Sequence, residues 1–327
     1  MRPTITAVFT AYALLYPSLA HCEGVWERSV DFFSFRFDFL LYAVLGGVLV
    51  GLTCGVLGTF MVLRRLSLMG DALGHAALPG VGIAFLIVQT KSMGPILFGA
   101  TSTALLAALT VGYISRNTRT YPDAALGMVL ASFFGLGVVV LSYVQNTTTA
   151  AKSGLTDFLF GNAAAIKPEE LYLLAAILVV TLAAVTLLYR PLQVMSFDSA
   201  LADAMGLPTR WLHYGMMTLV AMTIVASIQS VGVVLVAAML ITPASAAYLL
   251  TDRLHIMIGI SAFIGALSGF LGTFVSYLFA GFSSGPSMVI VASLIFAFVF
   301  FFAPGRGQVA IALKHRRKRK ALQGGQT

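Results

Sequence analysis

Long apolar segments follow one another along most of this chain, and they constrain its fold more than any other feature. A helix needs about 20 predominantly apolar residues to cross the hydrocarbon core of a bilayer. Such segments lie at about residues 39–63, 67–89, 94–114, 123–143, 170–189, 211–227, 231–250, 256–279 and 286–303. We therefore predict an all-α polytopic integral membrane protein, a helical bundle of about 8–10 transmembrane helices.

The overall composition excludes a soluble protein. The chain has 327 residues, of which 59% are hydrophobic and 10% charged, and its mean hydropathy is +0.93. Soluble domains usually carry roughly a quarter charged residues, because charge is needed to cover their surface. Residence in the lipid bilayer follows.

The net charge of +8 does not indicate nucleic-acid binding, because much of it lies in one short tail. Six of the 20 Lys and Arg residues are Lys314, Arg316, Arg317, Lys318, Arg319 and Lys320. A basic run beside a last hydrophobic segment is typical of a topology anchor on the anionic inner leaflet. We expect 306–327 to be a basic cytoplasmic tail that binds no nucleic acid.

The N-terminal residues 1–37 differ from the rest. Arg2, the apolar run from Ile5 and the triplet Ser18–Leu19–Ala20 fit a cleavable signal peptide, and they fit an extra transmembrane segment almost as well. An aromatic and charged stretch from Trp26 onward is suited to the membrane interface. The two cysteines of the chain are too few for a thiolate metal site.

The basic residues of the short loops predict the orientation. Cytoplasmic loops carry an excess of Lys and Arg, and one orientation places every cluster on the cytoplasmic side. The clusters are Arg64–Arg65, Arg116 with Arg119, Arg190 with Arg210, Arg253, and the tail. This orientation puts the C-terminus inside and the loop 144–169 outside.

Glycines recur through the first apolar segment at about one helical turn. They are Gly46, Gly47, Gly51, Gly55 and Gly58. Small residues at this spacing let helices approach closely, so this segment is expected inside a packed bundle.

One acidic residue lies inside an apolar segment, and it is followed by a histidine one helical turn later. Asp71 and His75 are four residues apart, which places both side chains on one helical face. An ionisable residue within a span marks a functional site by default, and a carboxylate with an imidazole suits Mn, Fe or Zn. Two alternatives stay open: Asp71 caps a helix end while His75 is a core histidine, or the pair relays protons.

A second motif lies in the long loop 190–210. The segment Ser196–Pro208 is predicted to form a two-turn helix, with Asp198 near its positive N-terminal end, Gly206 ending it and Pro208 preventing a restart. Ala200 and Ala204 form a small-residue stripe on which another protein could sit. The alternative is a solvated connector with no partner.

No glycine-rich loop ending in Gly-Lys-Ser/Thr occurs in the sequence, so the chain has no ATP site of that type. It also lacks the nucleophile-elbow and zinc-protease motifs, which argues against a membrane enzyme. If the protein's activity consumes energy, another polypeptide supplies it.

Four stretches resemble one family of membrane proteins. Residues Arg64 to Ala76, Phe197 to Pro208, Val231 to Pro243 and Ser283 to Ser287 are similar to those of bacterial manganese/zinc/iron ABC importer permeases. The resemblance covers about residues 38–305, taken here as the transmembrane permease domain. The motif around Asp71 is more similar to the manganese branch of the family than to the zinc branch.

The resemblance implies a function. Asp71 and His75 correspond to the intramembrane metal site of that family, and Phe197, Asp198, Ala200, Ala204 and Gly206 to the helix that docks on the ATPase. It implies import of manganese or iron ahead of zinc by alternating access, with no permanently bound cofactor and no catalytic residues. The implied partners are a cytoplasmic ABC ATPase, an extracytoplasmic metal-binding protein and a second permease copy or paralogue in a bacterial inner membrane. A secondary metal/proton transporter, with Asp71 as proton carrier, is the competing hypothesis.

Overall fold

The computed structural model describes residues 29, 31–32, 38–88, 93–147, 166–279, 282–303 and 307–308. Their main elements are all helices: α2 (Asp38–Leu63), α3 (Ser67–Ala76), α4 (Leu78–Val88), α5 (Met93–Asn117), α6 (Pro122–Thr147), α8 (Pro168–Leu187), α9 (Tyr189–Phe197), α10 (Ser199–Ala204), α11 (Thr209–Val231), α12 (Val233–Leu250), α13 (Leu254–Leu278) and α14 (Ser284–Phe302). The all-α prediction is confirmed for these residues. The signal-like segment before residue 29 and the basic run at 314–320 lie outside the described residues.

Eight helical segments of the described chain are long and apolar enough to cross a membrane. They are Phe39–Leu63, Ser67–Val88, Gly94–Ser115, Asp123–Val144, Pro168–Leu187, Thr209–Ile228, Leu254–Leu278 and Ser284–Phe302. The ninth predicted segment, 231–250, corresponds to α12, whose apolar part Leu235–Leu250 is shorter. At about 1.5 Å per residue, this part alone falls short of a bilayer core of about 30 Å.

The predicted segment 67–89 is two helices rather than one. Helix α3 ends at Ala76, and α4 begins at Leu78. The cause of the break is Pro79, which has no backbone N–H to donate to the residue four positions earlier. The periodicity of the apolar residues does not reveal this break. The break therefore lies directly beyond His75.

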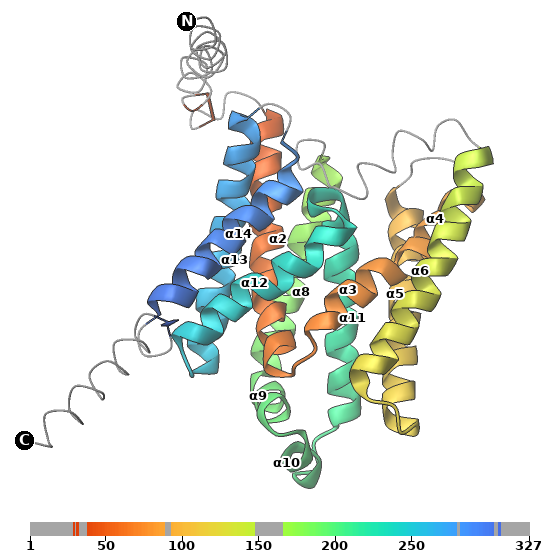
Figure 1. Cartoon of the computed structure of the whole chain (residues 1–327), viewed down its shortest axis with the longest axis vertical. Helices are drawn as coiled ribbons and strands as arrows, with labels where there is room; N and C mark the ends of the chain where they lie inside the picture. Colours follow the sequence, from red (N-terminus) through yellow and green to blue (C-terminus); the bar gives the residue numbers. More distant parts are fainter. Residues whose placement is uncertain are drawn as a thin grey trace, which may run out of the picture.

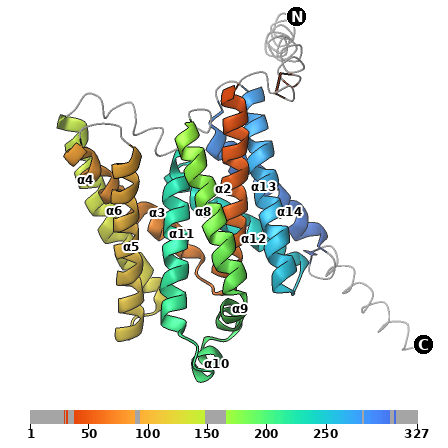
Figure 2. The same ribbon diagram turned by 180° about the vertical axis from the view of Figure 1, so that it is seen from behind.

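The helices form two groups with α3 between them (Figures 1 and 2). In one group α2 packs along α13, and α12 packs against both α2 and α14. In the other group α4, α5 and α6 pack on one another. Helix α3 contacts α5 and α6 on one side and α11 and α12 on the other. The helix that carries Asp71 and His75 is thus at the centre of the molecule.

Glycines allow the closest helix contact in the first group, as the sequence predicts. A Cβ atom on Gly51 would meet the backbone of Gly265, and one on Gly55 would lie 2.5 Å from the carbonyl oxygen of Ser261. The Ser261 hydroxyl donates a hydrogen bond of 2.6 Å to the Gly55 carbonyl. Backbones packed this closely have no room for a larger residue.

Replacing Gly265 by valine should therefore destabilise the protein by about 1–3 kcal/mol or more, because the methyl groups would meet the backbone of α2. The control is Gly259→Val on the same helix, where an added Cβ has nothing within 4 Å. Thermal unfolding of the detergent-purified variants measures both. Equal midpoints for the two variants would show that the α2–α13 contact tolerates side chains.

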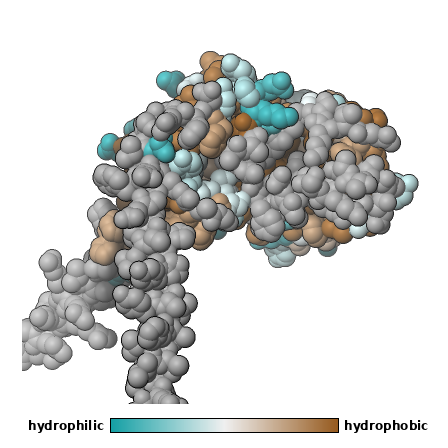
Figure 3. All heavy atoms as spheres, turned by 90° about the horizontal axis from the view of Figure 1, so that it is seen from above, coloured by the Kyte–Doolittle hydropathy of each residue, from teal (hydrophilic) through white to brown (hydrophobic). Residues whose placement is uncertain are grey.

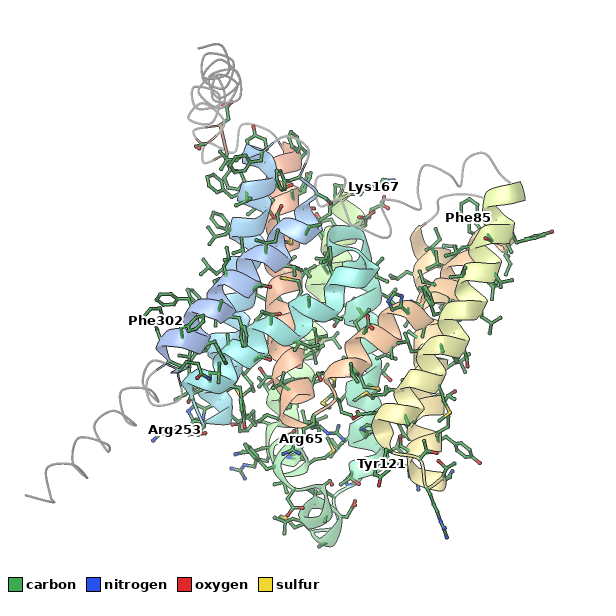
Figure 4. All side chains as sticks on the ribbon, viewed as in Figure 1. Arg65, Phe85, Tyr121, Lys167, Arg253 and Phe302 are labelled. Carbon is green, nitrogen blue, oxygen red and sulfur yellow. The ribbon has the colours of Figure 1, made fainter. Side chains whose placement is uncertain are left out.

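The labelled basic residues lie at both ends of the bundle. Arg65 and Arg253 lie at the end where α10 projects, whereas Lys167 lies at the opposite end (Figures 1 and 4). Viewed from that opposite end, hydrophilic residues are interspersed with apolar ones between the parts drawn in grey (Figure 3). That the end with Arg65 and Arg253 faces the cytoplasm stays a prediction of the positive-inside rule.

Candidate metal site and coupling segment

Helix α3 presents one face that the rest of the chain leaves partly open. Met69, Ala72, Leu73 and Ala76 are buried against neighbouring helices, whereas Leu68 is exposed. Asp71 and His75 are only partly buried, with side-chain exposures of 41% and 18%. The spacing of these residues follows the helical repeat, so the carboxylate and the imidazole share the open face.

The two side chains contact each other along this face. His75 Nε2 lies 3.4 Å from Asp71 Oδ1. The His75 ring also packs edge-on against Phe134 of α6, with ring centroids 4.9 Å apart. Its Nδ1 atom is buried and has no hydrogen-bond partner among the described residues. When the neutral ring donates its Nε2 proton toward Asp71, Nδ1 presents a lone pair that can bind a metal or accept a hydrogen bond from water.

The alternative in which Asp71 caps a helix end and His75 is a core histidine does not agree with the geometry of α3. Helix α3 begins at Ser67, its N-cap residue is Leu66, and no side chain caps it. The Asp71 carboxylate is a full turn inside the helix and faces His75 instead of the free backbone amides. Since His75 Nδ1 lacks a partner in the described part of the chain, it is not a fully satisfied core histidine either.

Small residues surround the pair. A Cβ atom on Gly70 would come within 3.6 Å of Ala237 on α12. Next to the helix break, a Cβ atom on Gly137 of α6 would lie 2.8 Å from Leu78. A side chain at Gly137 would push α6 away from the start of α4, whereas at Gly70 a methyl group would just touch α12.

The pair supplies two metal donors. Within the part of the chain that the structure describes, no group of three or more His, Cys, Asp and Glu side chains could hold a metal ion. Ions such as Mn²⁺ take further oxygen ligands readily. Any metal bound here would complete its coordination with water, backbone or a second protein chain.

The predicted coupling segment contains a short helix with defined ends. Helix α10 spans the six residues Ser199–Ala204. The Asp198 carboxylate caps it by accepting hydrogen bonds from Ala200 N (2.9 Å) and Leu201 N (3.0 Å). At the other end Gly206 has φ +74°, and Leu207 N donates to Ala202 O at 3.1 Å. This is a Schellman ending, in which glycine is strongly preferred.

The exposed face of this segment is more apolar than the alanine stripe predicts. Ala200 and Ala204 are exposed, and so are Phe197, Leu201 and Met205, each more than half accessible. Ala202 is fully buried and anchors the helix to the bundle. Large apolar side chains gathered on a projecting end are typical of a protein-binding surface.

The helix in this segment is shorter than predicted. The predicted two-turn helix within Ser196–Pro208 is the single short helix α10, and a second helix, α9 (Tyr189–Phe197), precedes it. Asp198 lies at the N-terminal end of α10, as the sequence predicts, and aspartate is a strongly preferred N-cap residue. The sequence analysis also did not predict that Leu201 and Met205 are exposed on this segment.

Comparison with known proteins agrees with this architecture. The sequence matches the ABC 3 transport family over residues 36–303. The manganese transport system membrane protein MntC of Listeria monocytogenes is 39% identical over 272 residues, which are 83% of this chain and 93% of that protein. The zinc transport system membrane protein TroC of Treponema pallidum is 37% identical over 280 residues, 86% of this chain and 94% of TroC.

A solved structure is similar over nearly its whole length. PsaBC from Streptococcus pneumoniae in complex with Fab superposes with a TM-score of 0.76 and 35% identity, covering 87% of this chain and 99% of that chain. The resemblance drawn from residues 38–305 is thus confirmed. A match to the family over four fifths of the sequence, together with a relative and a solved chain that are covered over more than nine tenths of their own lengths, shows that the chain belongs to the ABC 3 transport family.

Proposed function

We propose that this multi-pass membrane protein is the permease subunit through which an ATP-driven importer brings a divalent transition metal, manganese or iron ahead of zinc, into the bacterial cytoplasm. The observation that supports the metal is the Asp71–His75 pair on the open face of a central, interrupted helix, with 3.4 Å between Nε2 and Oδ1. Ionisable residues within a span are costly in lipid, and they therefore mark a functional site by default. A carboxylate oxygen with an imidazole nitrogen is a donor set for Mn, Fe and Zn.

Transport would proceed by alternating access. The ion arrives from an extracytoplasmic binding protein at the end that carries Lys167, binds at Asp71 and His75, and leaves at the end that carries α10. Since the pair offers two donors, water or the equivalent pair of a second permease copy would complete the coordination. The segment around α10 would dock on a separate ATPase through the exposed Phe197, Leu201 and Met205, with Ala200 and Ala204 allowing close approach.

The choice of metal rests on the relatives. MntC is named for manganese and TroC for zinc, at 39% and 37% identity. The more similar of these two relatives is the manganese protein, so manganese is placed ahead of zinc among the metals that the donor set accepts.

Metal-resolved uptake tests the proposed function. Cells that lack their own manganese importer would carry this permease with its ATPase and binding protein, and the intracellular Mn, Fe and Zn contents would be measured at limiting supply. We expect manganese or iron to rise well ahead of zinc, and the rise to stop when ATP is depleted but not when the proton gradient is collapsed. Uptake that follows the proton gradient would instead indicate a secondary transporter.

The basic tail should matter for orientation more than for transport. Each Lys or Arg near the inner leaflet contributes about 1 kcal/mol of attraction, so deleting residues 314–327 should lower the amount of correctly oriented protein. Labelling of a cysteine introduced beside Lys167, from outside the cell, measures the oriented fraction. Normal orientation with abolished uptake would show that the tail takes part in gating.

A further inference from the structure

An apolar groove lies between α2, α8 and α11, toward the end of the bundle where α10 projects (Figure 2). Its volume is about 490 Å³, and its lining includes Leu57 of α2, Leu188 at the end of α8 and Trp211 of α11. No charged residue of the described chain lines it. An apolar cavity of about 150 Å³ already holds a benzene molecule, so this groove has room for a longer apolar ligand.

The groove has the length of one leaflet of a bilayer. On α11 it extends from Pro208 to Leu219, 11 residues further on, or about 16 Å along a helix axis. Half of a hydrocarbon core of about 30 Å is about 15 Å. Trp211, near the start of α11, is 77% exposed, and tryptophan is enriched where a bilayer meets water. An acyl chain that enters beside Trp211 would thus be accommodated along its length.

The walls of the groove are open to lipid. On α8, Val180 is 52% and Leu187 82% exposed, and such residues in a span are matched by lipid tails, which are as apolar as leucine. Gly215 of α11 lines the groove and keeps it wide, because a Cβ atom added there would have nothing within 4 Å. The groove is therefore a recess in an apolar outer surface and not a closed core cavity.

Two arginines lie at the end of the groove near α10. Arg210 is in the first turn of α11 and lines a more polar hollow, which shares Pro208 with the groove. Arg190 of α9 is flanked by the groove residues Leu188 and Leu192, each two positions away, or about 3 Å along a helix axis. Both arginine side chains are exposed. The apolar recess thus has positive charge at its interfacial end.

The two guanidinium groups are available for an anion. Neither Arg190 nor Arg210 forms an ion pair or a side-chain hydrogen bond within the described part of the chain. Asp203 lines the polar hollow beside Arg210, but its carboxylate accepts a hydrogen bond from the Thr209 hydroxyl instead. Guanidinium groups stay charged and bind phosphate oxygens in pairs of hydrogen bonds.

We propose that this groove binds one anionic phospholipid, with an acyl chain along α11 and the phosphate on Arg190 and Arg210. An apolar recess of one leaflet's length with free arginines at its interfacial end matches the two parts of such a lipid. The positive-inside rule assigns this end to the cytoplasmic side, where the leaflet is anionic. The lipid contacts α9 and α11, the helices on either side of α10. The site requires only that the chain spans a bilayer, and it is independent of the transported metal.

The test is a titration of phosphatidylglycerol into the detergent-purified full-length protein, followed by native mass spectrometry. Phosphatidylcholine with the same acyl chains is the control lipid without net charge. A basic residue near the membrane surface contributes about fivefold in affinity for anionic lipid, so the native protein should prefer phosphatidylglycerol by about 25-fold. Arg190→Gln combined with Arg210→Gln should remove this preference. The corresponding double lysine variant, which keeps both charges, should retain most of it.

A second pair of arginines provides the matched control. Arg119 and Arg253 are exposed, and neither lines the groove. Arg253 lies at the same end of the bundle (Figure 4). Arg119→Gln combined with Arg253→Gln removes the same charge and should leave the preference for phosphatidylglycerol unchanged.

Filling the groove tests the position of the acyl chain. Gly215→Leu places a side chain in the recess, where no atom lies within 4 Å of the new Cβ, so the fold should tolerate it. The affinity for phosphatidylglycerol should fall at least about fivefold. Gly259→Leu on α13 also has nothing within 4 Å of the added Cβ, and it lies outside the groove, so it should keep the native affinity.

Three results would overturn the lipid site. An equal loss in the two double glutamine variants would show that phosphatidylglycerol responds to the total charge of the protein. Native affinity in Gly215→Leu would show that the head group binds without an acyl chain in the groove. A change in the number of protein copies in Gly215→Leu, with lipid binding intact, would show that the groove is a contact between copies of this chain.

Discussion

Replacing Asp71 by asparagine, or His75 by alanine, should reduce manganese uptake at limiting metal by about 100-fold or more. Loss of a hydrogen-bond partner behind a metal ligand already lowers affinity or activity by about 10–100-fold, and these residues are proposed as direct ligands. Membrane insertion should not suffer, because an aspartate at the centre of a span costs about 2.5–3.5 kcal/mol and asparagine removes that charge. The measurement is initial uptake of manganese, normalised to the amount of permease in the membrane.

The chain offers a matched control for each change. Asp123 is exposed in the first turn of α6, and His255 is exposed at the start of α13. Asp123→Asn and His255→Ala should therefore keep native uptake. Uptake that is normal in Asp71→Asn and His75→Ala would contradict the metal-site assignment. A loss that is equal in the control variants would show that uptake responds to charge in general.

The second large effect is expected at Gly206. This residue has φ +74°, a conformation that costs a bulky L-residue about 1–2 kcal/mol. Gly206→Val should therefore disturb the end of α10 and the position of the exposed Met205. A loss of about 1.4 kcal/mol of binding free energy lowers the affinity of the permease for the ATPase tenfold. Co-purification of the ATPase and metal-stimulated ATP hydrolysis should therefore both fall by about that factor. Metal binding to the permease should stay unchanged.

Asparagine distinguishes the backbone effect from mere bulk. It adopts the left-handed conformation far more readily than valine does, and an added Cβ atom at Gly206 has nothing within 4 Å. Gly206→Asn should therefore retain the ATPase. Ala204→Trp changes the exposed surface without touching the turn and should also weaken docking. If all three variants keep full ATPase association, residues 197–207 are a connector only.

The sequence predicted the class of fold and the central pair because these depend on local and compositional signals. Apolar length identified the spans, and the glycine spacing in residues 46–58 placed α2 inside a packed bundle. Asp71 and His75 could be paired because a spacing of four fixes their relation on any helix.

Features that leave no trace in hydropathy or spacing could not be predicted in this way. The contact of Arg64 with His213 joins residues 149 positions apart, and no periodicity relates them. The break between α3 and α4 depends on a single proline within an apolar run, where hydropathy does not change. The short α12 likewise matches a full span in hydropathy, and its true length depends on Gly232, whose φ of +93° ends α11 and starts α12.

The most direct test of the account is manganese accumulation in liposomes that contain the purified permease and ATPase, with the binding protein outside and no proton gradient. We predict accumulation that requires ATP, is stronger for manganese or iron than for zinc, and is absent in Asp71→Asn despite intact complex assembly. ATP-dependent accumulation that persists at the native rate in Asp71→Asn, or accumulation that requires a proton gradient and not ATP, would contradict it.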